Sequence, residues 1–304
     1  MSLLVVGSVA YDGIETPHGK VDRMLGGSST YIAIAASYFT DVQLVGVIGD
    51  DFSPEDIDTF KAHSIDLEGL ERLPGKTFYW SGVYSRNMNE RTTLTTDLNV
   101  FADFDPKLPE TYCSTPYAFL GNIHPVLQRK VRSQLTDVRL IGGDTMNFWI
   151  EGTPKELSQA IAEWDVILIN DQEARELSGE YDLWRAARYT CASGPKKVVI
   201  KRGEYGAVLF DASGYFVAPG FLLETVLDPT GAGDSFAGGF MGYLAGEGLS
   251  NIDAATESQL RKAMIYGSVM GSFCCEQFGI GRLRTLARSD IEQRFEEFRK
   301  LTQF

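Results

Sequence analysis

The sequence predicts an α/β fold with a mostly parallel central sheet. Short apolar runs, each closed by a polar residue or a glycine, recur at residues 3–9, 42–48, 117–122, 138–144, 166–170 and 198–203. Segments with helical character separate them, for example residues 154–164 and 171–177. This alternation predicts right-handed β-α-β crossovers. Because no internal repeat or linker interrupts it, we expect residues 1–304 to form a single domain.

Composition excludes several classes of protein. The chain is 44% hydrophobic, enough for a sizeable core, and its net charge of -13 argues against a general nucleic-acid or membrane-surface binder. It does not exclude ATP, whose site is local. No apolar run approaches membrane-spanning length. The four cysteines show neither zinc-site spacing nor a disulfide framework, so we expect a cytoplasmic protein; they are Cys113, Cys191, Cys274 and Cys275.

Polar and glycine residues follow the first predicted strand. Asp12 comes just beyond the apolar run 3–9. Ligands of open α/β sheets collect at the carboxyl ends of strands, so Asp12 is a candidate acceptor for a substrate hydroxyl. The alternative is an Asx turn before Gly13. Gly26 and Gly27 mark the entry to a helix of small and apolar residues.

Residues 76–100 differ from the rest of the chain. They are rich in β-branched and aromatic residues around a polar turn at residues 87–89, which predicts a hairpin. We expect a small sheet with one face toward a ligand or another subunit, and the alternative is a solvated edge hairpin. A second hairpin is predicted at residues 207–218.

Residues 228–240 carry the strongest chemical signal. Gly231 and Gly233 allow a tight turn that presents backbone N–H groups, and Asp234 and Ser235 stand where a helix is expected to begin. Because a helix start attracts anions, this stretch predicts an anion site beside a carboxylate. An ordinary glycine-rich turn capped by Asp234 or Ser235 is the alternative.

Taken in order, these segments resemble the ribokinase-like (PfkB) carbohydrate kinases over nearly the whole chain. Residues 228–236 match the family's carboxyl-side signature, with the letters DPTGAGDSF, and Gly26-Gly27 match its amino-side glycine pair. Asn170 and Glu173 match its N-x-x-E element, and residues 201–206 resemble its strand-end glycine segment. The resemblance implies a three-layer α/β/α ribokinase-like fold with a small β-sheet lid, formed by about residues 13–24 and 76–99.

The resemblance also implies roles in phosphoryl transfer from ATP. Asp234 would be the general base that takes a proton from the acceptor hydroxyl. The backbone N–H groups of Gly231, Ala232, Gly233 and Asp234 would form an anion hole for the transferring phosphoryl group. The turn is not a Walker A loop, since no G-x-x-x-x-G-K-[ST] occurs.

The remaining cofactor sites follow from the same resemblance. Asn170 and Glu173 would place Mg²⁺, through water, although Glu173 could instead be an ordinary carboxylate of a first helical turn. Asp228 and Thr230 resemble the potassium site of cation-activated members, together with backbone of residues 272–281. The residues implied to contact ATP are Asn170, Lys201, Gly203, Gly206, Thr230 and Gly279.

The acceptor site departs from the family pattern. The residues expected to hold the acceptor are Asp12, Gly26, Gly27, Tyr31, Asp144 and Asn147. Ser28 and Tyr31 stand where ribokinases have a lysine and an asparagine, and Phe148 replaces the arginine of D-x-N-x-R. Loss of this arginine argues against a carboxylate or phosphate on the acceptor. We expect Phe148 and Trp149 to be core residues; the alternative is that they stack on a sugar face or a nucleoside base, together with Tyr31 and the hairpin aromatics Phe78, Tyr79 and Trp80.

The sequence therefore predicts a cytoplasmic kinase that transfers the γ-phosphoryl group of MgATP to a hydroxyl of a sugar or sugar-like small molecule. A nucleoside kinase and a non-catalytic sugar or nucleotide sensor are the alternatives. A Rossmann dehydrogenase is disfavoured because no G-x-G-x-x-G follows the first strand. By analogy with relatives whose lids pair between subunits, a homodimer through the lid is expected.

Overall fold

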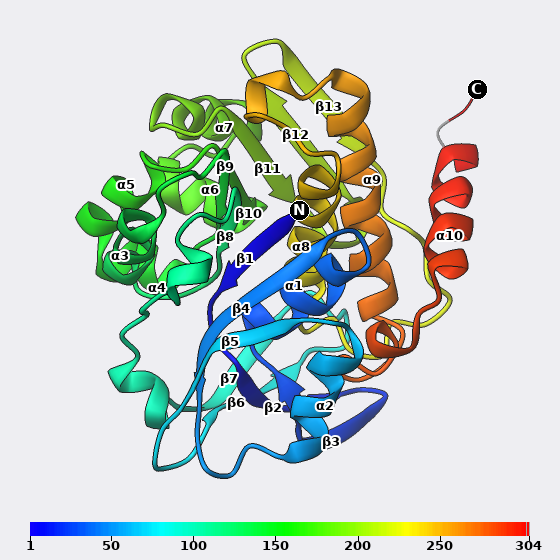
Figure 1. Ribbon diagram of the computed structural model, residues 1–304. Coiled ribbons are helices and arrows are strands. Elements are labelled where there is room, and N and C mark those ends of the chain that lie inside the picture. The colour runs from blue at the N-terminus through cyan, green and yellow to red at the C-terminus, as the bar shows by residue number, and fades with distance from the viewer. Residues whose placement is uncertain (302, 304) are drawn as a thin grey trace.

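The computed structural model, which describes residues 1–301 and 303, contains two sheets (Figure 1). The large sheet has nine strands in the order β13-β12-β11-β10-β9-β8-β1-β4-β5. Its strands are β1 (Ser2–Val6), β4 (Asp41–Ile48), β5 (Asp66–Arg72), β8 (Tyr117–Leu120), β9 (Leu140–Gly143), β10 (Val166–Asn170), β11 (Lys197–Lys201), β12 (Ala207–Asp211) and β13 (Gly214–Ala218). All neighbours from β5 to β11 pair in parallel, and β12 and β13 add an antiparallel hairpin.

Apolar side chains leave the large sheet on both faces. Along β1, Leu3 and Val5 join one core cluster, whereas Leu4 and Val6 join the other. This alternation explains why the strand reads as a continuous apolar run, because a parallel sheet covered on both sides buries every residue.

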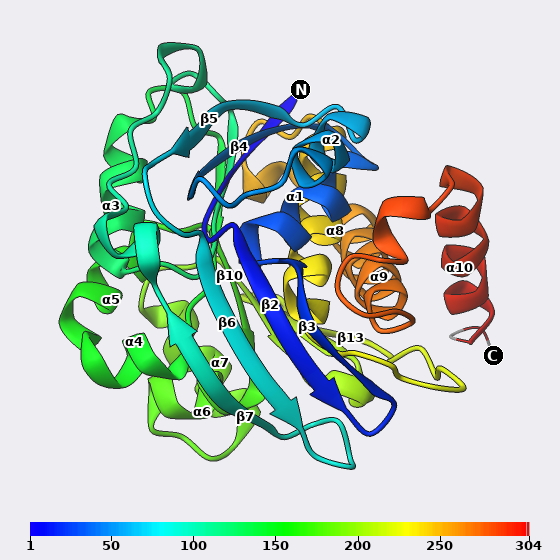
Figure 2. The ribbon, with the colours of Figure 1, turned by 90° about the horizontal axis from the view of Figure 1, so that it is seen from below.

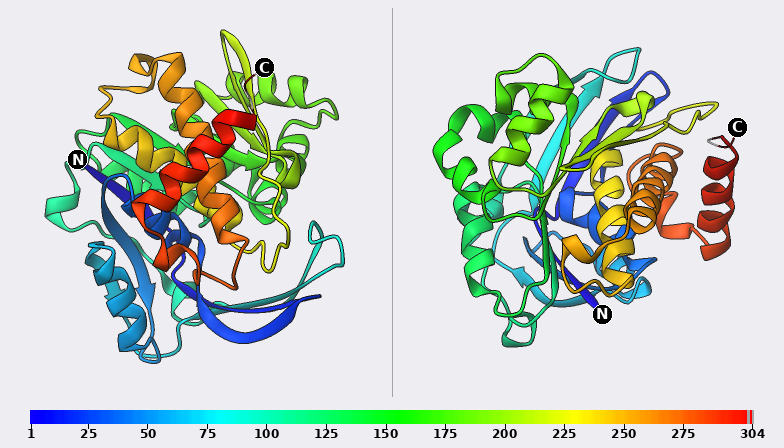
Figure 3. Two further views of the ribbon diagram at one scale, coloured as in Figure 1. Left: turned by 90° about the vertical axis from the view of Figure 1, so that its right-hand side faces the viewer. Right: turned by 90° about the horizontal axis from the view of Figure 1, so that it is seen from above.

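Helices form a layer on each face of the large sheet, so that the predicted three-layer fold is confirmed (Figure 3). One layer contains α1 (Ser28–Ser37), α2 (Pro54–Ala62), α8 (Ala232–Gly246), α9 (Glu257–Cys274) and α10 (Arg288–Leu301). The other contains α3 (Pro125–Gln134), α4 (Asn147–Gly152), α5 (Pro154–Ile161), α6 (Asp171–Ser178) and α7 (Leu183–Ala192). Within the described part of the chain, no helix combines the length and the apolar character needed to cross a membrane.

The small sheet has four strands in the order β3-β2-β6-β7 (Figure 2). They are β2 (Ala10–Thr16), β3 (Gly19–Gly26), β6 (Phe78–Tyr84) and β7 (Arg91–Asp97). The hairpin predicted at residues 76–100 is confirmed as β6 and β7. That this sheet acts as a lid, or pairs with a second copy, stays a prediction.

The position of Asp12 differs from the prediction. Strand β1 ends at Val6, and Asp12 lies within β2 of the small sheet instead of just beyond the carboxyl end of the first strand. In β2, Asp12 pairs with Met24 of β3 and with Trp80 of β6. The apolar run through Val9 concealed this change of sheet, because both strands are buried.

Glycines of α8 allow three helices to pack closely. A Cβ atom on Gly238 would lie 2.4 Å from the Ile32 carbonyl oxygen of α1, and one on Gly239 would lie 2.7 Å from the Tyr266 carbonyl oxygen of α9. Real Cβ atoms do not approach backbone so closely, so these helices meet only because the side chains are absent. This packing fixes α8, whose amino end bears the predicted chemistry.

We expect Gly238→Ala to lower the free energy of unfolding by about 1–3 kcal/mol, since the new methyl group would force α1 and α8 apart. Chemical denaturation measures the change. The matched control is Gly152→Ala at the end of α4, where a Cβ would meet nothing within 4 Å, and its effect should stay within about 0.5 kcal/mol. Equal stabilities for the two variants would contradict the packing argument.

Candidate active site

The glycine-rich segment forms a tight turn that opens directly into α8. Gly231 is the N-cap residue, in the left-handed region with φ 75°, and no side chain caps the helix. The helix begins at Ala232, earlier than predicted, so that Asp234 belongs to the first turn and is not its cap. The Ala232 N–H donates to the Pro229 carbonyl (3.2 Å). Gly233 and Asp234 follow where helical N–H groups have no carbonyl partner within the helix, which favours anions.

The Tyr31 ring packs against this turn. A Cβ on Gly231 would lie 2.4 Å from the Tyr31 ring. The ring is 1% exposed, and its hydroxyl has no hydrogen-bond partner. Tyr31 was predicted to contact the acceptor, but the structure places it in the packing between α1 and the turn. The contact of Tyr31 with an acceptor stays a prediction, and the buried ring has no exposed face that would support it.

Asp234 is half-buried and interacts electrostatically with two cations. Burial raises the pKa of its carboxyl group, while the positive charges of Lys201 and Arg91 lower it. Lys201 ends strand β11, and its Nζ lies only 3.0 Å from where a Cβ on Gly233 would stand. The ammonium group therefore lies over the turn, and the contact of Lys201 with ATP stays a prediction.

Asp144 follows β9 and joins the same cluster. Burial raises its pKa well above the usual range, the charges of Asp234 and Glu173 raise it further, and Lys201 opposes them. Its Oδ1 atom is buried and has no hydrogen-bond partner. The predicted contact of Asp144 with the acceptor stays a prediction. In the structure, Asp144 interacts electrostatically with Lys201 and Glu173.

Asn170 and Glu173 form a capping box at the start of α6. The Asn170 N–H donates to Glu173 Oε2 (2.8 Å), and the Glu173 N–H donates to Asn170 Oδ1 (2.8 Å). The alternative reading of Glu173 as a first-turn carboxylate thus describes its local role. Burial also raises the pKa of Glu173, and Lys201 lowers it.

The donor set here fits a magnesium ion that keeps most of its waters. Among the residues that the structure describes, no three His, Cys, Asp or Glu side chains are grouped closely enough to hold a metal ion by themselves. Asp144 nevertheless offers an unpartnered buried oxygen close to Glu173. Mg²⁺ commonly binds through one or two carboxylates together with substrate phosphates, so the arrangement is compatible with Mg²⁺ brought in with ATP.

Asp12 sits directly on the glycine pair. The Gly27 N–H donates to Asp12 Oδ2 (3.4 Å), and a Cβ on Gly26 would lie 2.0 Å from the same oxygen. Burial raises the Asp12 pKa to about 7, an effect that the charges of Asp228 and Asp234 strengthen and that the Gly27 N–H and Arg91 oppose. The two glycines therefore make room for the Asp12 carboxylate.

Asp228 ties the turn to a distant loop. Its Oδ1 accepts the Thr230 N–H (2.9 Å), and its Oδ2 accepts the Gly279 N–H (2.9 Å). The Cys274 thiol donates to the Thr230 carbonyl (3.2 Å). Both Asp228 oxygens are thus engaged with backbone, and a potassium ion beside this loop stays a prediction.

The segment after β11 forms a compact turn in front of the sheet. Gly203 and Gly206 both have positive φ, and a Cβ on Gly206 would lie 2.1 Å from the Ala218 carbonyl oxygen. The tip of the β6–β7 hairpin reaches this turn, where Asn89 Nδ2 donates to Glu204 Oε1 (3.4 Å). The contact of Gly203 and Gly206 with ATP stays a prediction.

Residues 147–149 begin helix α4. Asn147 is exposed at its first position, and Phe148 is 62% exposed, so the prediction that Phe148 is a core residue is wrong. Trp149 is partly buried, and its indole N–H donates to Asn122 Oδ1 (2.8 Å). The helix is only six residues long, too short to bury both aromatic rings.

Sequence reasoning missed two residues of the small sheet, Tyr84 and Arg91. Thr230 Oγ1 donates to the Tyr84 hydroxyl (3.1 Å), and Arg91 is a hydrogen-bond partner of the same hydroxyl. The two residues are paired across β6 and β7. The only sequence signal was their place beside the hairpin turn, in a segment already expected to cover a ligand.

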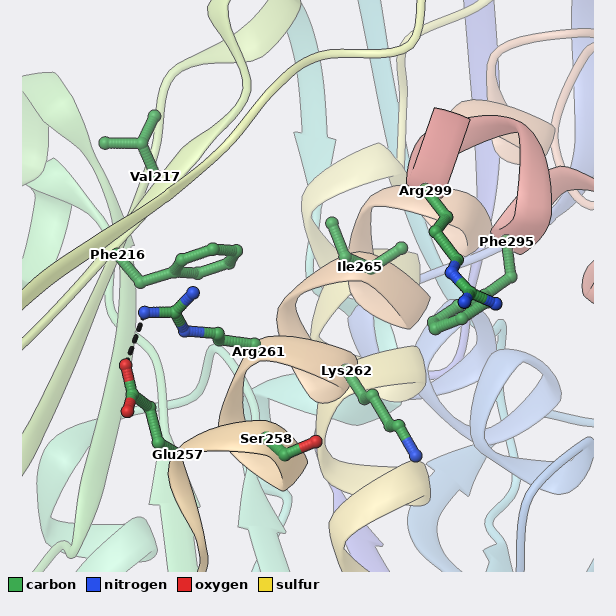
Figure 4. Close-up of a pocket in the computed structure, with 9 residues that line it drawn as sticks. All are labelled: Phe216, Val217, Glu257, Ser258, Arg261, Lys262, Ile265, Phe295 and Arg299. Carbon is green, nitrogen blue, oxygen red and sulfur yellow. Dashed lines mark hydrogen bonds and ion pairs between the residues drawn. The ribbon is translucent and has the colours of Figure 1, made fainter. Parts of the chain in front are cut away.

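A separate surface pocket of about 910 Å³ lies between β13, α9 and α10 (Figure 4). Its lining residues are Phe216, Val217, Glu257, Ser258, Arg261, Lys262, Ile265, Phe295 and Arg299. Arg261 lies over the Phe216 ring and pairs with Glu257. None of the predicted site residues lines this pocket.

Comparison with known proteins agrees with this architecture. A ribokinase from Thermotoga maritima superposes with a TM-score of 0.77 at 20% identity, covering 97% of this chain and 99% of that one. A nucleoside kinase from Methanocaldococcus jannaschii, described as an archaeal member of the ribokinase family, gives a TM-score of 0.76 at 18% identity, covering 97% and 98%. At these identities the likeness shows the fold.

Sequence comparison reaches further. A cytidine kinase from Thermococcus kodakarensis is 30% identical over 255 residues, which cover 82% of this chain and 91% of that protein. The family model described as pfkB family carbohydrate kinase matches residues 2–285. The chain therefore belongs to the PfkB family of carbohydrate kinases.

Proposed function

We propose that this kinase transfers the γ-phosphoryl group of MgATP to a hydroxyl of a nucleoside, with Asp234 as general base. The observation that carries the proposal is the position of Asp234. It lies half-buried in the first turn of α8, beside the glycine turn, and it interacts electrostatically with Asp12 and with Lys201. A carboxylate between an acceptor site and an anion site is what in-line phosphoryl transfer requires.

The ionised Asp234 would accept the acceptor's hydroxyl proton as the bond between that oxygen and the γ-phosphorus forms and the bond to ADP breaks. Burial suits this role, because a raised pKa makes the carboxylate a better proton acceptor. Asp12 would orient the acceptor by accepting a hydrogen bond from a second hydroxyl of that molecule. Its place on the glycine pair holds it rigid.

Charge on the phosphates would be balanced from the opposite side. Lys201 would bind the phosphate oxygens of ATP over the turn, and the N–H groups of Gly233 and Asp234 would bind the transferring group. Mg²⁺ bound with ATP would neutralise phosphate charge, with Asp144 and Glu173 as its nearest carboxylates. Asp228 would keep the turn and the Gly279 loop in register beside the nucleotide, next to the potassium position implied by the family.

Two observations support a nucleoside over a free sugar acid or sugar phosphate. The relative that covers most of this chain at 30% identity is a cytidine kinase. In addition, Phe148, four residues after Asp144, exposes an aromatic ring and not a guanidinium group. An exposed ring can stack on a base, whereas it cannot pair with a carboxylate or phosphate.

A substrate panel tests the acceptor class. We expect cytidine or another ribonucleoside to stimulate ADP release in the presence of Mg²⁺ and K⁺ at least tenfold more, in kcat/KM, than ribose or 2-dehydro-3-deoxygluconate. A coupled assay measures ADP. Preference for a free sugar would contradict the nucleoside assignment, and stimulation by none of these compounds would favour a sensor that retains the fold.

Asp234→Asn should lower kcat by about 1000-fold, within the range that general bases contribute, while the dissociation constant of ATP changes little. Steady-state kinetics and calorimetric titration with ATP measure the two effects. Asp253→Asn is the matched control, since Asp253 lies in a surface ion pair with Lys196 and its loss should leave kcat unchanged. Near wild-type turnover in Asp234→Asn would remove Asp234 as base.

Activity should fall on the acid side of neutrality. Burial raises the pKa of Asp12 to about 7, so this carboxylate gains a proton as the pH decreases through that value, and burial also raises the pKa of Asp234 above its usual value. Protonated Asp12 binds a hydroxyl of the acceptor less strongly, and protonated Asp234 cannot take the acceptor's proton. We expect kcat/KM to decline from about pH 7 downward, and a profile that stays flat to pH 5 would contradict these shifted values.

A further inference from the structure

The β6–β7 hairpin is attached to the anion turn at one point. Tyr84 and Arg91 form the last pair of the two strands before their connecting turn. The Tyr84 hydroxyl accepts the Thr230 hydroxyl proton (3.1 Å) and also bonds to Arg91. Thr230 immediately precedes Gly231, so the small sheet meets the turn beside the residues proposed to hold the phosphoryl group.

The reaction centre is rich in carboxylates, although the group to be transferred is itself an anion. Lys201 counters the burial that raises the pKa of Asp234, Asp144 and Glu173, and its Nζ lies over Gly233 of the turn. Arg91 counters the burial that raises the pKa of Asp12 and Asp234. Asp234 therefore interacts with two cations that come from different elements.

Arg91 is held in place without being neutralised. Its guanidinium carbon lies 4.9 Å from the centroid of the Trp80 ring, a cation–π contact within the same sheet. Among the residues that the structure describes, no carboxylate approaches Arg91 closely enough to form an ion pair. Its charge, which acts on Asp12 and Asp234, is therefore available to a bound anion.

We propose that Arg91 binds the transferring phosphoryl group on its acceptor side, as a second cation opposite Lys201. The inference rests on the proposed function and adds to it a residue of the small sheet. A guanidinium group offers paired N–H donors whose spacing matches two phosphoryl oxygens. It can stay bound to the phosphoryl group while that group moves from ATP toward the acceptor. When the acceptor O–P bond forms and the bond to ADP breaks, Arg91 stabilises charge while Asp234 takes the proton.

The test compares Arg91→Gln and Arg91→Lys with the matched control Arg86→Gln; both arginines are exposed in the same hairpin, but only Arg91 acts on Asp12 and Asp234. We expect Arg91→Gln to lower kcat by about 100-fold, Arg91→Lys to recover part of the loss, and Arg86→Gln to resemble the wild type. Equal kcat in Arg91→Gln and wild type would overturn the proposal.

A binding measurement separates contact with the phosphoryl group from support of the hairpin. Aluminium fluoride with MgADP imitates the group in transfer, so calorimetry with MgADP, with and without fluoroaluminate, is done in the presence of the best acceptor of the panel. We expect fluoroaluminate to tighten MgADP binding to the wild type at least tenfold and to have no such effect in Arg91→Gln. MgADP alone should bind both proteins equally.

Tyr84→Phe completes the design, because it removes the hydroxyl that joins Arg91 to Thr230 and keeps the guanidinium group. A loss as large as that of Arg91→Gln would show that Arg91 acts by holding the hairpin, and would overturn the proposal. Undiminished tightening by fluoroaluminate in Arg91→Gln would overturn it while the proposed function stands. Absence of tightening in the wild type would contradict both.

Discussion

The arrangement of the site follows from one electrostatic constraint, the burial of several carboxylates beside a turn that must attract an anion. Asp12 and Asp144 are buried, Glu173 and Asp234 are half-buried, and burial is the largest cause of each raised pKa. Such a cluster would repel phosphate unless cations and backbone donors face it. Lys201 at the end of β11 and the open N–H groups of α8 supply this compensation.

Close packing keeps these opposed charges in position. Helix α8 carries Asp234 and cannot shift without disturbing α1 and α9, since Gly238 and Gly239 bring it against their backbones. The Tyr31 ring packs against Gly231. The two carboxylate oxygens of Asp228 accept backbone N–H groups, one from Thr230 in the turn and one from Gly279 in the later loop. A site held in this way loses little free energy to reorganisation when a charged transition state forms.

Local sequence predicted the large sheet well because its strands are buried on both faces and read as apolar runs. It placed Asp12 wrongly, since the boundary between β1 and β2 depends on pairing with β6, some 70 residues later in the chain. The prediction for Phe148 failed because an aromatic residue in a short helix was assumed to be buried.

Arg91 was missed for a related reason. On a polar strand of alternating threonines it resembles an ordinary surface residue, and only the folded hairpin brings it toward Asp12 and Asp234. The glycine turn and Asp234 were recognised because their signal is contiguous. The small sheet brings together residues from segments that are separate in the sequence, and no local sequence pattern predicts that these segments are close in the structure.

The buried carboxylates also bear on folding. Asp12, Asp144 and Asp234 have higher pKa values in the folded chain than in the unfolded one, so the folded state binds their protons more tightly. Their ionisation destabilises the folded chain above the folded pKa, about 7 for Asp12, and this penalty is relieved as the pH falls toward the unfolded value of 3.8. With respect to these three groups, conformational stability increases in the pH range where the carboxylates needed for chemistry are lost.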